Sequence, residues 1–121
     1  MPQYQDLDAF KVAHELTLQV HRVVEGLRER DPELAGQLWQ TALTASSRIA
    51  RGSAFSSRKY FGYSLNRSIS ALGEMEYYLN LADGLGLIDQ ETGKQLEGLR
   101  ARANFYVSKL LFSLLEPPEP G

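Results

Sequence analysis

The sequence predicts an all-α protein whose single domain is an antiparallel, up-down-up-down four-helix bundle. Four segments carry apolar residues at steps of three and four, the spacing of one face of an α-helix. The connections between these segments are short, and short connections place neighbouring helices antiparallel. No segment alternates apolar and polar residues over a convincing length, as a strand does. We expect the bundle over residues 1–116 and a proline-rich tail over residues 117–121.

The first two helices are predicted from an apolar stripe and from the residues that begin and end each helix. The first stripe consists of Ala13, Leu16, Val20, Val23 and Leu27. Either Asp6 or Asp8 can cap the start of this helix. The helices are separated at Asp31 and Pro32, because Asp is a good N-cap and Pro suits the first helical position. The second stripe, which ends near Gly52, consists of Leu34, Leu38, Thr41, Ala45 and Ile49.

The third helix is expected from about Arg58 to Asp83. Ser56 or Ser57 can cap its start. Its apolar stripe consists of Phe61, Leu65, Ile69, Leu72, Met75, Leu79 and Ala82. Gly84 and Gly86 follow it, and glycine takes the left-handed conformation that ends many helices. The helix therefore has both a start signal and a stop signal.

The fourth helix, which Asp89 can cap, is apolar over more than one face. Its core face consists of Leu96, Leu99, Ala103, Tyr106, Leu110 and Leu114. Its second half adds apolar residues that one amphipathic face does not require, and the first helix has a second stripe. A helix that is apolar all round is buried all round. We therefore expect a homo-oligomer whose interface includes Leu7, Phe10, Phe105, Leu111, Phe112 and Leu115.

Positive charge is concentrated in one stretch of an acidic chain. The chain has 13 Lys and Arg against 15 Asp and Glu, a net charge of −2. Residues 34–73 contain no acidic residue, and their cations are Arg48, Arg51, Arg58, Lys59 and Arg67. Uneven charge is an argument about partners rather than about fold. The first four of these cations adjoin the junction of the second and third helices, so we expect them together at one end of the bundle.

Aromatic residues are interleaved with these cations. Tyr60 and Tyr63 are positioned to stack on bases. We therefore predict a nucleic-acid-binding surface formed by Arg48, Arg51, Arg58, Lys59, Arg67 and Tyr60. The alternative is a solvated face whose charge is neutralised by Glu74, by Glu76 or by a neighbouring subunit. Both interpretations are open at this point.

No set of residues predicts a catalytic or a metal site. The chain has no cysteine, and His14 and His21 are seven residues apart, wider than the four-residue spacing of helical metal pairs. Glu74 and Glu76 are two apart, which places them on different sides of a helix. We expect no enzyme, no metal, no cofactor and no small-molecule substrate. No apolar run approaches the ~20 residues of a bilayer span, and the start of the chain lacks a signal-peptide pattern, so we expect a cytoplasmic protein without membrane contact.

Four ordered segments resemble a known family. They read "LDAFKVAHEL", "QLWQTALTASSRIARG", "SRKYF" and "ALGEMEYYLNLADGLGL". Their order and spacing resemble the four-helix-bundle proteins encoded in intervening sequences of bacterial 23S ribosomal RNA genes. Arg48 and Arg51 stand where that family usually has Asn and Glu, and Ala71 stands where it usually has Ser.

The resemblance implies a partner and an assembly. The family has no established enzymatic activity, and it is similar to the accessory protein of diversity-generating retroelements, a pentameric ring that binds nucleic acid. The resemblance therefore implies a homo-oligomeric ring, with a pentamer favoured, and an RNA or DNA partner. Two functions are expected: a non-enzymatic scaffold that binds nucleic acid, or a protein-interaction adaptor that binds an acidic protein.

Overall fold

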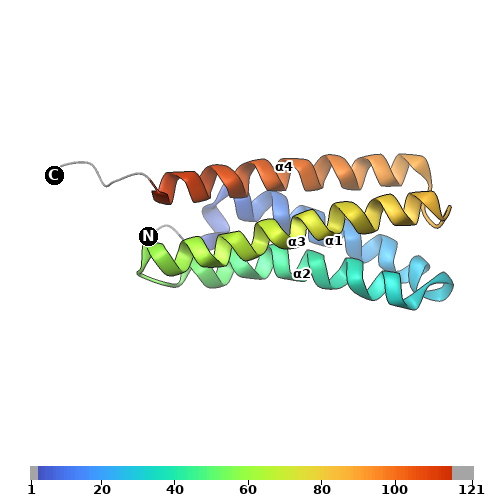
Figure 1. Cartoon of the computed structure of the whole chain (residues 1–121), viewed down its shortest axis with the longest axis horizontal. Helices are drawn as coiled ribbons and strands as arrows, with labels where there is room; N and C mark the ends of the chain where they lie inside the picture. Colours follow the sequence, from blue (N-terminus) through green and yellow to red (C-terminus); the bar gives the residue numbers. More distant parts are fainter. Residues whose placement is uncertain (1–2, 116–121) are drawn as a thin grey trace.

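Four long helices lie side by side in the computed structural model, which describes residues 3–115 (Figure 1). The elements are η1 (Tyr4–Asp6), α1 (Asp8–Arg30), α2 (Pro32–Ser53), α3 (Arg58–Gly84) and α4 (Gln90–Leu115). This part of the chain contains no strand. The prediction of one all-α domain with four helices is confirmed. The predicted tail over residues 117–121 lies outside the described residues.

Each helix packs against two others. α2 lies between α1 and α3, and α4 packs against both α3 and α1, so α1 and α3 lie across the bundle from each other. Arg30 near the end of α1 donates a hydrogen bond to the carbonyl oxygen of Gly86, just after α3, at 3.5 Å. Arg58 at the start of α3 donates to the carbonyl oxygen of Leu114 at the end of α4, at 2.9 Å. The α2–α3 connection therefore lies at the same end of the molecule as the carboxyl end of α4 (Figure 1).

The apolar stripes of the first three helices form the core. The largest fully buried side chains include Leu16, Leu38, Ile49, Leu65, Leu72 and Met75. Burial of such a side chain stabilises the fold by ~1.5–3 kcal/mol. α4 buries less than the sequence predicts, because its predicted core residues Leu99, Tyr106, Leu110 and Leu114 are only half-buried. On α1, four of the five predicted core residues are buried, and only Val23 is half-buried, with Val24 buried beside it.

Serine hydroxyl groups form hydrogen bonds between α2 and the two helices beside it. Ser46 of α2 donates to the carbonyl oxygen of Ala13 in α1 at 2.9 Å, and Ser68 of α3 donates to the carbonyl oxygen of Ala45 at 2.7 Å. Both serines are buried, so an unpaired hydroxyl there would cost ~1–3 kcal/mol. These small side chains let the helices approach closely while every buried hydroxyl finds an acceptor.

Three of the four α-helices begin at a side-chain cap. The carboxylate of Asp31 accepts from the backbone N–H of Leu34 at 3.0 Å, and the hydroxyl of Ser57 accepts from the N–H of Tyr60 at 3.4 Å. Asp89 caps α4 in the same way. α1 differs: the expectation that Asp6 or Asp8 caps it is wrong. Its N-cap residue is Leu7, which has no side-chain acceptor, because η1 leads directly into the helix and Leu7 packs against the core.

A glycine ends α3. Gly86 has φ of 67°, the left-handed conformation that glycine adopts without steric cost. The N–H of Gly86 donates to the carbonyl oxygen of Asp83 at 3.0 Å, and the N–H of Leu87 reaches back to that of Ala82 at 2.9 Å. This pair of bonds is a Schellman motif, which satisfies the last carbonyl groups of the helix. The stop predicted from the sequence is confirmed at Gly86, whereas Gly84 is still helical.

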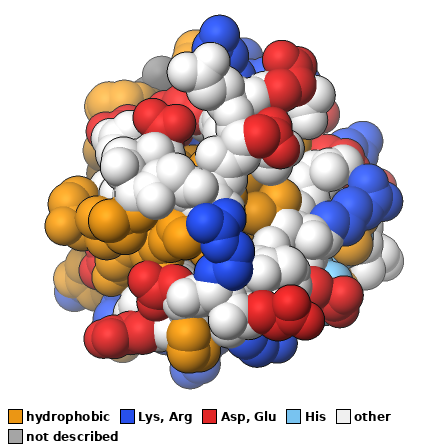
Figure 2. Space-filling view, turned by 90° about the vertical axis from the view of Figure 1, so that its right-hand side faces the viewer, with side chains coloured by type: hydrophobic (Ala, Val, Ile, Leu, Met, Phe, Trp, Pro, Cys, Tyr) orange, Lys and Arg blue, Asp and Glu red, His pale blue; other side chains and the backbone are white. Residues whose placement is uncertain are grey.

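Charge differs between the two ends of the bundle. Figure 2 looks at the end formed by the α1–α2 and α3–α4 connections, where several groups of acidic side chains lie among basic and apolar ones. The acidic residues of these two regions are Glu25, Glu29, Asp31, Glu33, Asp83, Asp89 and Glu91. The α2–α3 connection, where the predicted basic residues lie, is at the other end. Among the described residues, no helix combines the length and the apolar character needed to cross a membrane.

Candidate nucleic-acid interface

The α2–α3 connection, residues 54–57, brings the predicted basic residues onto two neighbouring helices. The helices approach closely just before it, because Gly52 has no side chain: a Cβ there would lie 2.8 Å from Phe61 Cδ1 and 2.8 Å from Ser64 Cβ. The hydroxyl of Ser64 donates to the carbonyl oxygen of Arg48 at 2.6 Å. The last two turns of α2 therefore lie directly against the first turns of α3.

Four cations at this junction have no acidic partner in the described chain. We refer to Arg48, Arg51, Lys59 and Arg67 as the basic surface. Arg48 is half-buried and the other three are exposed. None of the ion pairs between residues 3–115 includes any of them. Glu76, one of the carboxylates expected to neutralise this charge, pairs instead with Arg100 at 2.6 Å, and Glu74 forms no ion pair there.

Arg58 has a structural role that the sequence analysis missed. Its guanidinium donates to the carbonyl oxygen of Ser113 at 3.0 Å and to that of Leu114 at 2.9 and 3.2 Å. The carboxyl end of a helix carries unpaired carbonyl groups and partial negative charge, which a cation satisfies. Arg58 therefore ties the start of α3 to the end of α4. The sequence contained a signal for this role, because a cation in the first turn of a helix is disfavoured by the dipole of that helix and is better placed near the carboxyl end of another.

Aromatic rings are exposed beside the basic surface. Tyr60 and Tyr63 are 58% and 56% exposed, and their ring centroids are 6.3 Å apart. Phe55, in the connection, extends this group, with its centroid 5.9 Å from that of Tyr60. The Nζ of Lys59 lies 5.9 Å from the centroid of the Tyr63 ring. The structure thus brings the predicted tyrosines together and adds Phe55, which was not among the predicted site residues.

The predicted interface residues fall into two groups. Phe105, Phe112 and Leu115 of α4 are 61%, 67% and 69% exposed. The two phenylalanines are seven residues apart, so they lie on the same side of the helix two turns apart. The other three, Leu7, Phe10 and Leu111, are half-buried and pack against the core of the same chain. Of the predicted interface residues, the structure therefore leaves Phe105, Phe112 and Leu115 largely open to solvent.

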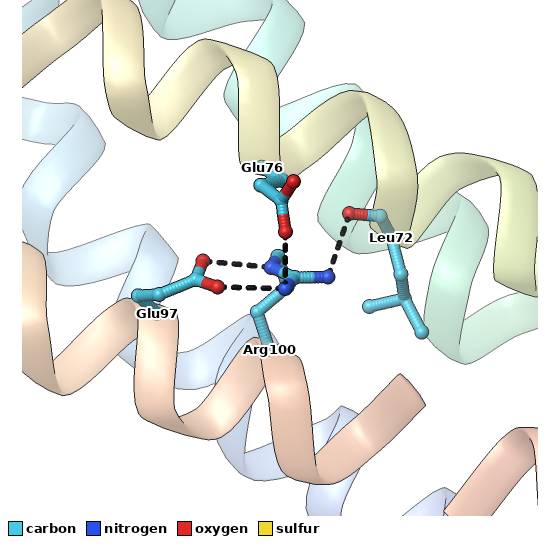
Figure 3. Close-up of polar contacts among 4 residues, drawn as sticks. All are labelled: Leu72, Glu76, Glu97 and Arg100. Atoms are coloured by element: carbon cyan, nitrogen blue, oxygen red, sulfur yellow. Dashed lines mark hydrogen bonds and ion pairs between the residues drawn. The ribbon is translucent and has the colours of Figure 1, made fainter. Parts of the chain in front are cut away.

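A buried arginine joins α3 to α4, and no prediction included it (Figure 3). Arg100 is 8% exposed. It donates to Glu97 at 2.6 and 2.7 Å, to Glu76 at 2.6 Å and to the carbonyl oxygen of Leu72 at 3.5 Å. The hydrogen bond with Glu97 is the largest cause that raises the pKa of Arg100 above its ordinary value. The sequence signal was the Glu97–Arg100 spacing of three, which places both on one helix face.

The two histidines take part in ring contacts. The ring of His14 stacks on that of Phe10 at 5.4 Å between centroids. His21 meets the ring of Trp39 edge-on at 5.2 Å, and its Nε2 lies 3.9 Å from Glu25. Among the described residues, no group of three or more His, Cys, Asp or Glu side chains is placed to hold a metal ion.

A groove between α1 and α4 lies away from the basic surface. It encloses about 440 Å³, and the residues that line it include Gln19, Val23, Leu96 and Arg102. Such a groove needs a nucleophile, a base and the geometry between them to support a catalytic site. The lining also includes Lys94 and Thr92, whose hydroxyl donates to the carboxylate of Asp89 at 2.9 Å. The expectation of a non-enzymatic protein stays a prediction.

Comparisons with known proteins agree with this architecture. By its fold, the protein is a small four-helix protein, with the basic surface at the α2–α3 junction and an exposed apolar surface on α4. The model of the 23S rRNA-intervening sequence protein family matches residues 5–104, and the chain belongs to this family.

A solved structure shares the fold. The chain is similar to a crystal structure of a protein with unknown function from the S23 ribosomal protein family of Bacteroides thetaiotaomicron. The TM-score is 0.81 at 16% sequence identity, and the match covers 86% of this chain and 95% of that one. At this identity the likeness shows the fold alone. A comparison with curated proteins gives no match.

Proposed function

We propose that this protein is a non-enzymatic, homo-oligomeric scaffold that binds nucleic acid through the basic surface. The observation that carries the proposal is that Arg51, Lys59 and Arg67 are exposed and have no acidic partner within residues 3–115. Unneutralised cations on adjacent helices attract phosphates, and release of the counterions of the nucleic acid drives such binding. The resemblance to nucleic-acid-binding bundles supports the same partner, RNA or DNA.

The apolar surface of α4 supports a homo-oligomer. Phe105, Phe112 and Leu115 together expose a large apolar area, and burial of each would contribute ~1.5–3 kcal/mol. We propose a ring of up-down-up-down protomers, a chain order that the hydrogen bonds between helix ends support. The resemblance favours a pentamer. In a ring the basic surface repeats in every subunit, so weak phosphate contacts add up along one nucleic acid.

Light scattering tests the assembly. We expect more than one subunit at micromolar concentration, and we expect the double variant Phe105→Glu, Phe112→Glu to dissociate while its helix content stays near that of the parent. Both rings are mostly outside the protomer core, so the variant should fold. Leu18→Glu is the matched control, because Leu18 is also an exposed apolar residue but lies on α1. A parent protein that is a clean monomer would contradict the proposal.

Charge reversal tests the binding surface. The best pair is Arg51→Glu with Lys59→Glu, since reversal of Arg58 would also break its hydrogen bonds to the end of α4. The matched control, Arg28→Glu with Lys94→Glu, makes the same change in net charge at exposed positions near the acidic end. We expect only the first pair to weaken retention on heparin and binding of labelled RNA and DNA, measured by fluorescence anisotropy.

Salt dependence separates the proposed function from its alternative. Affinity for nucleic acid should fall linearly on a log–log plot against salt, with a slope of about −0.7 per neutralised phosphate for single strands. The alternative is an adaptor that uses the same cations to bind an acidic protein. If reversal of Arg51 and Lys59 leaves RNA and DNA binding unchanged, and a protein partner is retained after nuclease treatment, the adaptor replaces the scaffold.

A further inference from the structure

An exposed aromatic cluster lies next to the basic surface. We refer to Phe55, Tyr60 and Tyr63 as the aromatic cluster. The three rings contact one another in sequence, with centroids 5.9 and 6.3 Å apart and interplanar angles of 46° and 70°. Each ring is more than a third exposed. The rings therefore form a continuous, partly exposed aromatic surface at the junction between α2 and α3.

The helical register of α3 alternates these rings with cations. Phe61, Ser64 and Leu65 are buried, so Tyr60 and Tyr63, three residues apart, lie outside the core face. Arg67 follows Tyr63 by one turn on the same side. The ammonium group of Lys59 lies near the ring of Tyr63 at 5.9 Å from its centroid. A ligand along this part of α3 would therefore meet positive charge and aromatic rings in alternation.

This alternation fits one form of nucleic acid. Proteins that bind single strands combine a cationic track for the phosphates with aromatic side chains on which bases stack. In a duplex the faces of the bases are covered by neighbouring base pairs, so a protein ring reaches them only after unstacking. A strand without a partner presents its base faces without that cost. Tyrosine suits this position, because its ring offers an apolar face while its hydroxyl stays in water.

We propose that the aromatic cluster stacks on unpaired bases, so that the ligand of the basic surface is single-stranded nucleic acid; this inference rests on the proposed function. The cations contact the phosphates, and Tyr60 and Tyr63 contact the bases. Stacking is tolerant of sequence, because every base has a flat face. The protein should therefore discriminate strand form much more strongly than base sequence.

Three probes of equal phosphate number test the inference: a single strand, a duplex with half as many base pairs, and an abasic single strand. Binding is measured by fluorescence anisotropy at one salt concentration. We expect the single strand to bind roughly tenfold or more tighter than the abasic strand, since one stacked base changes affinity by about 5- to 160-fold. In the double variant Tyr60→Ala, Tyr63→Ala, the two strands should bind with equal affinity, while the log–log slope of affinity against salt concentration should stay the same.

Matched variants keep the test independent of folding. Tyr77→Ala is the control, because Tyr77 is an equally exposed tyrosine of the same helix, 14 residues beyond Tyr63. It should bind all three probes as the parent does. Tyr63→Leu keeps an apolar side chain and removes only the aromatic face. It should lose part of the preference for bases with an unchanged melting temperature.

The outcomes separate the two proposals. If no probe and no heparin binds, the proposed function fails. If the single strand and the abasic strand bind equally and both are salt-sensitive, the proposed function stands and stacking by the aromatic cluster is refuted. Tighter binding of the duplex than of the single strand would also refute it.

Discussion

Replacement of Gly52 by alanine tests the closest contact between α2 and α3. A Cβ at this position would lie 2.8 Å from Phe61 Cδ1, 2.8 Å from Ser64 Cβ and 3.1 Å from Ser64 Oγ. Ordinary contact begins near 3.4 Å, so the two 2.8 Å contacts fall short by about 0.6 Å. Ser64 Cβ is attached to the backbone of α3 and cannot rotate away. The helices must therefore move apart, or the buried ring of Phe61 must shift.

The expected loss combines two opposing contributions. Overpacking of a well-packed core costs about 1–3 kcal/mol. Alanine is favoured over glycine inside a helix by about 0.5–1 kcal/mol, but Gly52 is next to the last residue of α2, where that gain is small. The net expectation for Gly52→Ala is a loss of about 1–2 kcal/mol in the free energy of unfolding, which lowers the melting temperature by roughly 4–8 °C.

Gly36→Ala is the matched control. Gly36 is in the same helix, is exposed, and an added Cβ there would meet nothing within 4 Å. This variant should be stabilised by about 0.5–1 kcal/mol, so the two substitutions should have opposite signs. Urea unfolding followed by far-UV circular dichroism, at one fixed protomer concentration, measures both. If Gly52→Ala is as stable as the parent while Gly36→Ala gains stability, the argument from close packing is refuted.

Three further predictions concern polar groups and metals. Arg100→Ala should destabilise by about 1–3 kcal/mol, because it removes a buried side chain that joins α3 to α4, whereas the carboxylates of Glu76 and Glu97 are 53% and 43% exposed and can be solvated by water. Arg100→Met keeps most of the buried volume and should lose less, as chemical denaturation will show. Hydrogen bonds from Thr92 lower the pKa of Asp89 in the folded protein. The ionised carboxylate therefore contributes its full stabilisation of the fold at pH values above the ordinary carboxyl pKa of ~3.9. This contribution is lost as the pH falls through the lower pKa that Asp89 has in the folded state. The stability difference between the parent and Asp89→Asn, which keeps a capping oxygen, should therefore shrink as melting curves are taken at lower pH; a constant difference would contradict this. A chelator should leave the melting temperature unchanged, and a large drop would reveal a metal site.

The sequence by itself determined the helices and most of their ends. Asp31, Ser57, Asp89 and Gly86 act on backbone groups within a few residues of themselves, so their roles follow from local chemistry. The periodicity of the apolar residues likewise shows which face of each of the first three helices is buried. The order of the sequence also places Arg48, Arg51, Arg58 and Lys59 near one junction, because they lie close to the connection between two consecutive helices.

Only the tertiary structure decided how individual side chains are used. Arg58 and its acceptor in α4 are 56 positions apart, and Arg100 and Glu76 are 24 apart. The charge of Arg58 and of its neighbours in the sequence predicts a place in the nucleic-acid surface, whereas the fold directs its guanidinium to the end of another helix. Leu7 and Phe10, which are expected at an interface, are half-buried against the core of their own chain, and their place in an interface stays a prediction. Such assignments depend on distances between helices, and a sequence pattern carries the period of each helix but not its rotation and depth against its neighbours.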